Sequence, residues 1–572
     1  MKQPRLQFDF NQQTTIFTKP IDIIQTNNLL KVHECLQHVQ TAIDNGYYVA
    51  GYLSYEVTYS FFNELHINKE NKHPLLWFGV FNEPKSTVVT TSNDKDYTIG
   101  SWKMRQSKTQ YKKHFNKIME SIQQGTMKQI NYTVSFDTQF SGNSARYYER
   151  LKSSQKSSYN AYLQLGDIDI LSASPELFFE VKDETITVKP MKGTIHRGKT
   201  LREDEANKRW LTNSRKNQHE NDLIVELMKK EILPLTQDNH VTVSSLYDVE
   251  KYPTVYQMTS TIKGNLKQNL SPITILQTLF PCGSISGVPK QETLVLINEV
   301  EPYPREVYCG AIGYFSPNGD AIFNVPIRTV TIDRNTNQAT YGAGGAITAQ
   351  SQVEEEYKEM LTKTKVLDMK EAPFELLETI GLIDGKFVLF DSHMKRLLDS
   401  ASYFDFAINE EAIVEKLQTL EKQYPSGKWR VRLTVNSEGA ITVTCAEQKS
   451  VLEPKVTLAQ NPIDRENIFH YHKTTYRTIY EAHANKHSFD TILWNDKNEV
   501  TEFTIGNIVI EQNGVYYTPP IECGVLPGTY REKLVHSGKV QEKVIYTSEL
   551  TANTNMWLIN SVRGWIKVSF NE

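Results

Sequence analysis

Cysteine is scarce in this sequence, and the cysteines that occur stand far apart. Five are present in 572 residues, namely Cys35, Cys282, Cys309, Cys445 and Cys523, and no two of them form a CxxC pair. This spacing argues against a disulfide framework and against a cysteine zinc site. It suits a protein that works in a reducing compartment.

Long apolar runs and an excess of one charge are also missing. No stretch reaches the roughly eighteen apolar residues of a membrane-spanning helix, and the first residues, MKQPRLQFDFNQQTT, lack the apolar core of a signal peptide. The 63 basic and 67 acidic residues leave a net charge of only -4, which gives no bulk attraction to nucleic acid or to an anionic membrane. We therefore expect a cytoplasmic protein that binds neither.

The length and the patterning indicate more than one globular core. A hydrophobic content of 39% is that of a globular protein, and a chain of 572 residues is too long for a single core. Near residue 370 a charged helical pattern, QVEEEYKEMLTKTKVLDMKEA, ends before Pro373, and FELLETIGLIDGKFVLFD begins a hairpin-like pattern. We predict an α+β protein with two domains, residues 1–368 and 373–572.

The first part mixes strand and helix patterns. INYTVSFDTQF and DIDILSAS read as strands, and PNGD reads as a hairpin turn between β-rich flanks. A polar, helical pattern runs from about Glu203 to Ile232, where Pro234 ends it.

Lys192 stands in a stretch with unusual chemistry, KPMKGTIHRG, which follows the strand-like run ETITVK. The glycine after the lysine allows close backbone approach, and Arg197 can bind a carboxylate through two hydrogen bonds. Most lysines are solvated, so from these residues alone a surface charge remains the alternative to an amine that attacks a substrate.

Acidic residues recur at helical spacing. HENDLIVELMKK places Glu220 beside apolar residues, and EEEYKEMLTK puts Glu356 and Glu359 on one helix face, with Lys363 one turn further. Such carboxylates repel each other unless a hard cation such as Mg²⁺ binds between them, and the alternative is a solvated acidic face. The glycine-rich run YGAGGAITAQS could present backbone N–H groups to an anion, as a phosphate loop does, although it lacks the spacing of a nucleotide-binding motif.

Nine motifs of the first part resemble those of the chorismate-utilising enzymes, a family of anthranilate, aminodeoxychorismate, isochorismate and salicylate synthases. In chain order they are SASPELFF, PMKGTIHRG, HENDLIVELM, QMTSTIKG, PCGSISGVPK, VYCGAIGYF, FNVPIRTV, GAGGAIT and EEEYKEMLTK. The resemblance implies a β-sandwich with helices, like that of anthranilate synthase component I, that binds chorismate and Mg²⁺. It implies a magnesium site of Glu220, Glu356 and Glu359, chorismate contacts from Tyr308, Arg328, Gly345 and Lys363, and Glu176 as the acid that protonates the departing ring hydroxyl.

The residue at position 192 distinguishes members of this family. Anthranilate synthases resemble PIAGT there, whereas aminodeoxychorismate synthases resemble PIKGT and use the lysine as a nucleophile on the ring. The resemblance thus implies amination of chorismate to 4-amino-4-deoxychorismate through a covalent Lys192 intermediate. Partial burial, or a neighbouring charge such as Arg197, would keep some of this lysine neutral.

Two further positions point away from the sister activities. Gln129 stands where isochorismate and salicylate synthases keep a lysine that activates water. Gln257 stands where anthranilate synthases carry a histidine linked to pyruvate elimination. The sequence also lacks the glycine-flanked cysteine and following His-Glu pair of a glutamine amidotransferase, so ammonia must come from a separate amidotransferase subunit or from solution.

The second part offers the groups that a phosphate-bearing cofactor on a lysine requires. HKTTYRTIY contains Lys473, EVTEFTIGNIVI contains Glu502 and Asn507 in a strand, and DSHMKRLLDSA contains Arg396. The chemistry needs an amine, a carboxylate for the ring nitrogen, and donors for the phosphate. Any one of these residues alone would be read as an ordinary surface or strand residue.

These motifs, with TPPIECGVLPGTYREKL and NSVRGW, resemble fold-type IV pyridoxal-phosphate enzymes, and 4-amino-4-deoxychorismate lyase more than the transaminases. The resemblance implies an α/β domain in which Lys473 carries the cofactor and moves protons and Glu502 pairs with its ring nitrogen. Arg396, Gly528 and Thr529 would hold the phosphate, and Asn507 is a further cofactor contact. Such sites usually lie at a dimer interface, so a homodimer through this domain is expected, although the lead-in before FELLETIGL is short.

The two resemblances name consecutive reactions, and together they predict a bifunctional enzyme that makes 4-aminobenzoate, a folate precursor, from chorismate and ammonia. Two alternatives stay open. One is an anthranilate synthase-like component joined to a pyridoxal-phosphate transaminase. The other is a chorismate-binding sensor without turnover.

Overall fold

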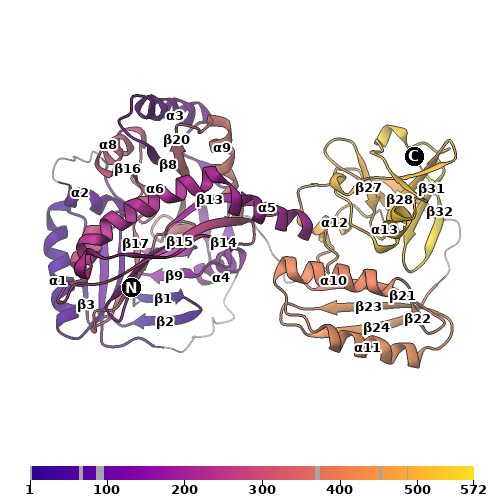
Figure 1. Ribbon diagram of the computed structural model, residues 1–572, viewed down its shortest axis with the longest axis horizontal. Helices are drawn as coiled ribbons and strands as arrows, with labels where there is room; N and C mark the ends of the chain where they lie inside the picture. The colour runs from indigo at the N-terminus through magenta and orange to yellow at the C-terminus, as the bar shows by residue number, and fades with distance from the viewer. Residues whose placement is uncertain are drawn as a thin grey trace. The chain divides into compact units, whose positions relative to one another are not determined.

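The computed structural model describes residues 3–62, 69–85, 96–367, 374–449, 454–485 and 487–571 (Figure 1). The chain divides into two compact units. The first unit consists of Met1–His196 and Lys208–Lys370, and the second consists of Arg197–Asn207 and Glu371–Glu572. The domain junction expected at 368–373, with Pro373, lies outside the described residues.

Two large sheets form the first unit. The first sheet has the strand order β16-β8-β20-β19-β10-β9-β1-β2, with β6 and β7 also paired to β8. Its strands are β1 (Arg5–Phe10), β2 (Gln13–Thr18), β6 (Thr98–Ile99), β7 (Lys103–Met104), β8 (Gln129–Ser141), β9 (Tyr159–Gln164), β10 (Ile168–Ser174), β16 (Gly287–Val288), β19 (Thr329–Asp333) and β20 (Gln338–Thr348).

The second sheet has the order β13-β15-β12-β11-β18-β17-β4-β5-β3, with β14 paired to β15. Its strands are β3 (Asp22–Thr26), β4 (Tyr48–Leu53), β5 (Leu76–Phe81), β11 (Leu177–Lys182), β12 (Thr185–Val188), β13 (Met191–His196), β14 (Thr242–Lys251), β15 (Val255–Asn265), β17 (Ala311–Phe315) and β18 (Ala321–Asn324).

A sandwich core joins the two sheets. Leu6 and Phe8 of β1 belong to the same buried cluster as Tyr52 of β4, Trp77 of β5 and Ile312 of β17. In β1, the alternate residues Leu6, Phe8 and Phe10 belong to this core, which is the pattern expected when two sheets pack face to face.

Helices pack around the sheets through apolar stripes at helical spacing. In α1 (Val32–Asp44), for example, Val32, Leu36, Val39 and Ile43 are the buried residues. The other helices of the first unit are α2 (Thr58–Phe61), α3 (Lys108–Gln123), α4 (Ser144–Gln155), α6 (Arg215–Ile232), α7 (Pro272–Leu279), α8 (Lys290–Val300) and α9 (Val353–Thr362). Helix α5 (Leu201–Asn213) begins in the second unit and ends in the first.

Several local expectations differ in detail from the structure. The helical pattern from Glu203 to Ile232 is two helices, α5 and α6, which separate at Ser214. Residues 341–348 of the glycine-rich run lie in the strand β20, where they pair with β8, so this part of the run is a sheet strand and not an anion-binding loop. The PNGD turn joins β17 to β18 as expected.

The second unit contains a small antiparallel sheet and a larger mixed sheet. The small sheet, in the order β22-β21-β23-β24, comprises β21 (Leu376–Ile383), β22 (Lys386–Phe387), β23 (Lys428–Val435) and β24 (Ile441–Glu447). Two helices, α10 (Phe390–Phe404) and α11 (Glu410–Gln423), share its core, as Leu397 and Leu417 pack in one cluster with Val431.

The larger sheet has the order β27-β26-β25-β32-β31-β28-β29-β30. Its strands are β25 (Lys455–Leu458), β26 (Asp490–Trp494), β27 (Val500–Phe503), β28 (Asn507–Gln512), β29 (Val515–Thr518), β30 (Gln541–Glu542), β31 (Met556–Asn560) and β32 (Gly564–Phe570), and its helices are α12 (Thr478–Glu481) and α13 (Thr529–His536). The single strand expected for EVTEFTIGNIVI is therefore the pair β27 and β28.

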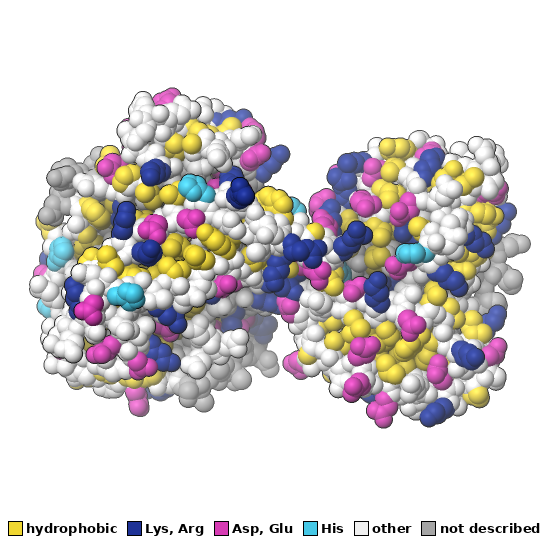
Figure 2. Space-filling model, viewed as in Figure 1, with side chains coloured by type: hydrophobic (Ala, Val, Ile, Leu, Met, Phe, Trp, Pro, Cys, Tyr) yellow, Lys and Arg dark blue, Asp and Glu magenta, His cyan; other side chains and the backbone are white. Residues whose placement is uncertain are grey.

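Charges of both signs are interspersed on the face of the molecule shown in Figure 2, in keeping with the small net charge. Within the described ranges, none of the helices combines the length and the apolar character needed to cross a bilayer.

Candidate active sites

A cavity of about 300 Å³ lies in the first unit and is lined by parts of β13, β20, α6 and α9. It brings together every site residue that the sequence predicts for this domain: Glu176, Lys192, Glu220, Tyr308, Arg328, Gly345, Glu356, Glu359 and Lys363. These residues are spread over almost two hundred positions of the chain. The roles assigned to them from sequence stay predictions.

Lys192, on β13, donates a hydrogen bond from Nζ to the carbonyl oxygen of Ser284 at 3.3 Å. Burial lowers the pKa of Lys192, and the positive charge of Lys363 lowers it further, against the opposing carboxylates of the cavity. An amine attacks only when it is neutral, so this setting favours a nucleophile. Arg197, whose positive charge was expected to lower the pKa of Lys192, instead pairs with Asp204 in the second unit.

Glu176 follows β10 and is only 4% exposed. Its Oε1 has no hydrogen-bond partner among the described residues. Burial raises the pKa of Glu176 to about 6, although a hydrogen bond from Ser284 and the charge of Lys192 oppose the shift. A carboxyl group with this pKa remains partly protonated near neutral pH, as a general acid must.

The three carboxylates expected to bind magnesium have different partners. Glu356 accepts a hydrogen bond of 2.6 Å from Ser351, and burial raises its pKa. Glu359 pairs with Lys363 at 2.8 Å, and this charge lowers its pKa. Nowhere in the described ranges are three His, Cys, Asp or Glu side chains already assembled as metal ligands. The donors are of the oxygen type that Mg²⁺ prefers.

Two glycines of β20, Gly342 and Gly345, leave one wall of this cavity without side chains. A Cβ on Gly342 would lie 2.3 Å from Cδ1 of Tyr308, so the tyrosine ring packs directly on the β20 backbone. A Cβ on Gly345 would lie 3.4 Å from Oε2 of Glu356 and 3.6 Å from Nζ of Lys363. The backbone at Gly345 therefore borders the charged end of the cavity.

Arg328 has a φ of 53°, in the left-handed region that residues with side chains rarely adopt. Its guanidinium donates a hydrogen bond of 2.7 Å to the carbonyl of Lys363, which also accepts one of 2.9 Å from the hydroxyl of Tyr341. These contacts fix the guanidinium against the end of α9, and functional sites are where such backbone strain is usually found.

A second cavity of about 300 Å³ lies in the second unit. It is lined by all six residues that the sequence predicts there: Arg396, Lys473, Glu502, Asn507, Gly528 and Thr529.

Lys473 is positioned next to the small sheet, where its carbonyl accepts a hydrogen bond of 3.0 Å from the backbone of Leu377. Burial, assisted by the charges of Arg396 and Arg477, lowers the pKa of Lys473 to about 8. A lysine that is partly neutral at ordinary pH can form a covalent link to an aldehyde cofactor.

Glu502, at 2% exposed, lies between two neutral donors. Its oxygens accept hydrogen bonds from the Tyr480 hydroxyl at 3.0 Å and from Nδ2 of Asn507 at 3.1 Å. Burial raises the pKa of Glu502 to about 7. Gly528 packs against the amide that helps to hold Glu502, since a Cβ there would lie 1.9 Å from Oδ1 of Asn507.

Arg396, on α10, is fixed by a carboxylate that the sequence did not single out. Its Nε and a terminal nitrogen bind the two oxygens of Glu378 at 2.9 and 2.6 Å. His393 lies 2.6 Å from the same carboxylate, and Thr529 lies 3.2 Å from His393. The charges of Arg396 and His393 together overcome burial and lower the pKa of Glu378 to about 2.

Sequence reasoning also missed four arginines of this cavity, Arg430, Arg432, Arg477 and Arg563. Arg430 and Arg432 alternate on β23 with the buried Val431 and Leu433, so both project from the face of the strand opposite its core. Two arginines at alternate positions of an amphipathic strand were the sequence signal that could have indicated them. With Arg396, the cavity gathers five guanidinium groups, which suits an anionic ligand.

Matches to known families agree with the two cavities. Residues 86–368 match the chorismate binding enzyme family, and residues 375–569 match the amino-transferase class IV family. The chain thus joins a chorismate binding enzyme domain to a class IV aminotransferase domain. The second match supports pyridoxal phosphate as the cofactor of the second unit.

Within the first domain, the sequence is similar to aminodeoxychorismate synthase component 1 of Escherichia coli (strain K12), with 35% identity over 273 residues, or 48% of this chain and 60% of that protein. Identity to the protein of the same name from Salmonella typhimurium is 34% over 263 residues, or 46% of this chain and 58% of that protein. The chain therefore spans somewhat less than two thirds of the length of these relatives.

Solved structures show the fold of the first domain. Anthranilate synthase component I from Streptococcus pneumoniae TIGR4 is similar with a TM-score of 0.53 and 22% identity, covering 64% of this chain and 90% of that chain. The menaquinone-specific isochorismate synthase MenF from Escherichia coli gives a TM-score of 0.52 at 18% identity, covering 64% and 88%. The expected anthranilate synthase-like sandwich is confirmed.

Proposed function

We propose that the chain is a bifunctional enzyme of 4-aminobenzoate synthesis. The first unit aminates chorismate to 4-amino-4-deoxychorismate, and the second unit converts this product to 4-aminobenzoate and pyruvate. The observation that carries the proposal is the Lys192 amine, with its lowered pKa, in one cavity with Glu176 and three further carboxylates. Relatives named aminodeoxychorismate synthase component 1 support the same reaction.

In the first reaction, Nζ of Lys192 adds to C2 of the ring while the bond from C4 to its hydroxyl oxygen breaks. Glu176 gives its proton to this oxygen, which leaves as water. Ammonia then attacks C4, the bond from C2 to Lys192 breaks, and a proton from the incoming nitrogen returns to Glu176. The balance is chorismate and ammonia in, 4-amino-4-deoxychorismate and water out.

The remaining residues of the first cavity would bind the two carboxylates of chorismate. Glu220, Glu356 and Glu359 would hold a magnesium ion, which supplies positive charge for one substrate carboxylate. Tyr308, Arg328, Gly345 and Lys363 would line the rest of the substrate.

In the second cavity, bound pyridoxal phosphate supplies an electron sink for bond breaking next to the amine. Lys473 would hold the cofactor and would also remove the ring proton. The bond from the ring to the side-chain oxygen would break, and the departing enolpyruvate would take up a proton at its methylene carbon to become pyruvate. Glu502 would face the pyridine nitrogen, supported by Asn507. Arg396 and the backbone at Gly528 and Thr529 would hold the phosphate.

The arginines of the second cavity favour a lyase over a simple transaminase. The amine that enters this site would carry two carboxylates, and Arg430, Arg432 and Arg563 add positive charge beyond that of Arg396. A branched-chain amino acid has a single carboxylate and an apolar side chain, which fits such a cavity poorly.

Supply and assembly complete the proposal. Ammonia would come from a separate glutamine amidotransferase, and the chain would work in the cytoplasm as a homodimer through its second domain. The two domains, 1–368 and 373–572, would carry one reaction each.

The purified protein tests the proposal directly. Given chorismate, Mg²⁺, pyridoxal phosphate and an ammonium salt, it should release 4-aminobenzoate, detected by fluorescence after chromatography, and omission of Mg²⁺ should abolish the product. Formation of anthranilate would contradict the role of Lys192, and binding of chorismate without turnover would favour a sensor.

One observation bears on the anthranilate alternative. Gln257 lines the first cavity and donates a hydrogen bond of 3.3 Å to the hydroxyl of Thr194. An amide cannot exchange protons near neutral pH as a histidine can, so pyruvate elimination would lack its acid and base in this cavity.

A further inference from the structure

The segment of residues 197–207 belongs to the second unit, although the residues before and after it belong to the first. It begins directly after β13, the strand that carries Lys192, and it includes the first part of α5. The range that matches the chorismate binding enzyme family, residues 86–368, includes this segment. A stretch of first-family sequence is thus built into the class IV aminotransferase unit.

A buried ion pair joins two residues of this segment, Arg197 and Asp204. The guanidinium of Arg197 binds both carboxylate oxygens of Asp204, at 2.6 and 2.7 Å, and the two side chains are 6% and 1% exposed. The backbone N–H of Gly198 donates a further hydrogen bond of 2.8 Å to Asp204. A Cβ at position 198 would lie 2.1 Å from the Asp204 nitrogen, so the turn requires glycine. Bidentate, buried ion pairs of this kind fix the relative position of the two side chains.

Two hydrogen bonds of opposite direction join the 197–207 segment to Tyr403, near the end of α10. Arg197 donates a hydrogen bond of 3.0 Å to the carbonyl of Tyr403, and the Tyr403 hydroxyl donates one of 2.8 Å to the carbonyl of Gly198. The guanidinium also lies 4.5 Å from the centre of the tyrosine ring. Tyr403 is 2% exposed, so these contacts are made in the interior.

Tyr403 in turn packs on the residue that precedes the cofactor lysine. The rings of Tyr403 and His472 are 4.3 Å apart, and Nδ1 of His472 lies 3.0 Å from the hydroxyl of Ser400 on α10. His472 is 4% exposed, and burial lowers its pKa to about 3, so the ring is neutral and acts as a packing group. Direct contacts therefore lead from Arg197 to the backbone of Lys473.

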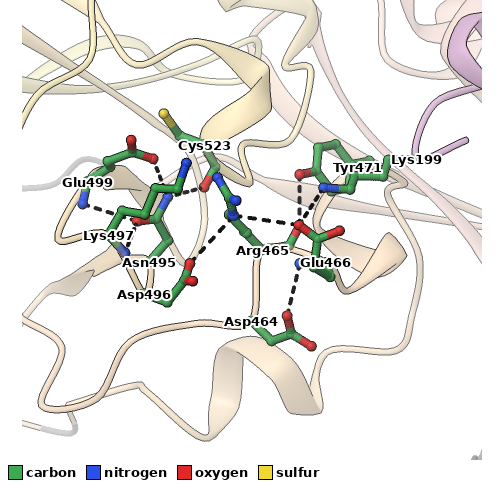
Figure 3. Close-up of polar contacts among 10 residues, drawn as sticks. All are labelled: Lys199, Asp464, Arg465, Glu466, Tyr471, Asn495, Asp496, Lys497, Glu499 and Cys523. Atoms are coloured by element: carbon green, nitrogen blue, oxygen red, sulfur yellow. Dashed lines mark hydrogen bonds and ion pairs between the residues drawn. The ribbon is translucent and has the colours of Figure 1, made fainter. Parts of the chain in front are cut away.

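A second set of contacts holds the chain just upstream of His472. Lys199 pairs with Glu466 at 2.9 Å and lies 5.6 Å from the ring centre of Tyr471. Figure 3 shows Lys199 beside Tyr471 and Glu466, and the Tyr471 hydroxyl donating to the carbonyl of Arg465 at 2.8 Å. The 197–207 segment thus holds residues 465–472 at two places.

We propose that residues 197–207 are a positioning element of the second active site. By holding Tyr403, His472 and Tyr471, this segment fixes the backbone of Lys473, and the site is complete only with it in place. The proposal rests on the proposed use of Lys473 as the cofactor lysine. It assigns no bond-making role to Arg197 or Asp204, which act on Lys473 through other residues.

Two variants of the full-length protein test this. Tyr403→Phe removes the hydroxyl that bonds Gly198 and keeps the ring against His472. Arg197→Met combined with Asp204→Leu removes the ion pair as a whole, so that no buried charge is left without its partner. Tyr424→Phe, whose ring packs on Trp429 beside α11, is the matched control.

The main measurement is hydrogen–deuterium exchange of residues 469–477 in the cofactor-free protein. We expect exchange there to be faster by at least about threefold in the double variant, by less in Tyr403→Phe, and unchanged in the control. After loading with pyridoxal phosphate, the pH midpoint of the cofactor absorbance should shift most in the double variant, less in Tyr403→Phe, and not at all in the control. Amination of chorismate should stay within about twofold of the parent in Tyr403→Phe.

The proposal is overturned if exchange rises in residues 197–207 but stays at the parent value in 469–477 with an unshifted absorbance midpoint. In that case the segment merely rests on the second unit. A protein that takes up no pyridoxal phosphate would count against the proposed function, whereas the exchange measurement on the cofactor-free chain would still decide the role of the segment.

Discussion

The hydroxyl of Tyr480 donates a hydrogen bond of 3.0 Å to the buried carboxylate of Glu502. With the amide of Asn507 on the other oxygen, the carboxylate is held by neutral donors, and burial raises its pKa to about 7. The charges of Arg477 and Lys473 oppose this rise in pKa. A carboxylate whose hydrogen-bond donors are neutral side chains can pair with a protonated ring nitrogen.

We expect Glu502→Gln to weaken the second reaction by at least about tenfold, because a charge-assisted hydrogen bond to the ring nitrogen becomes a neutral one. The measurement is release of pyruvate from 4-amino-4-deoxychorismate, together with the absorbance of the bound cofactor. Glu499→Gln, which changes a carboxylate bonded to Asn495 outside the cavity lining, is the control. Equal loss in both variants would contradict a specific role for Glu502.

The pH dependence of cofactor loading should report the Lys473 amine. A protonated lysine cannot react, so the rate of loading should rise with pH and level off above about 8, the lowered pKa of Lys473. Trapping with borohydride at timed intervals measures this rate. Arg477→Met removes a positive charge that lowers this pKa, so its midpoint should move to higher pH. A midpoint near the ordinary lysine value in the parent protein would contradict the assignment.

Lys192→Ala should reduce amination of chorismate by at least about a hundredfold when ammonium is scarce, because the nucleophile is removed. Formation of 4-amino-4-deoxychorismate, followed by mass spectrometry, is the measurement. Lys189→Ala, at a neighbouring lysine that pairs with Glu250, should leave the rate near that of the parent. The parent protein without ammonia should accumulate a covalent adduct at position 192, and undiminished amination in Lys192→Ala would refute the mechanism.

Glu176 should set the alkaline limb of the amination profile. Its pKa is raised to about 6, and the protonated form is the acid, so kcat/KM should fall as pH rises above about 6. Glu176→Gln should lower kcat by roughly 10²–10⁴-fold and remove this limb. A profile in the variant that kept the same fall above this pH would assign the limb to another group.

Arg305→Met should destabilise the first unit strongly. The Arg305 and Glu301 side chains are 2% and 4% exposed and pair at 2.7 Å, and Arg305 also donates to the carbonyls of Asn131 and Ile285 in the wall of the first cavity. Removing one partner of a buried pair costs about 3–5 kcal/mol of unfolding free energy. Denaturation in urea measures this cost.

The exposed pair of Lys117 and Glu299 gives the comparison for this variant. Lys117→Ala should cost less than about 1 kcal/mol. Similar costs for the two substitutions would mean that the buried pair adds nothing beyond a surface contact.

The two cavities bring together the residues that the sequence singles out, and part of this grouping has a local physical reason. Glu356, Glu359 and Lys363 sit at helical spacing in α9 and just after it, and the run ETITVK was visible as a strand, which is β12. Their convergence with Glu176 and Glu220 came from the family resemblance, since no local pattern encodes contacts between distant strands.

What sequence reasoning missed depends on tertiary packing. Ser214 separates α5 from α6 inside a continuous helical pattern, and the glycine-rich run is a sheet strand because β8 pairs with it. Arg197 was expected to act on Lys192, whereas its partners are Asp204 and Tyr403, the latter some two hundred positions away. Only the folded chain reveals such a partner.

The placement of residues 197–207 bears on how this gene could be dissected. A fragment that begins at Phe374 would lack residues 197–207 of the second unit. The ring of Tyr403, which is buried in the full chain, would then lose its contact with Arg197. Separate expression of the two family domains would therefore yield a class IV half with an exposed aromatic surface. Supplying the missing peptide in trans would be the natural remedy.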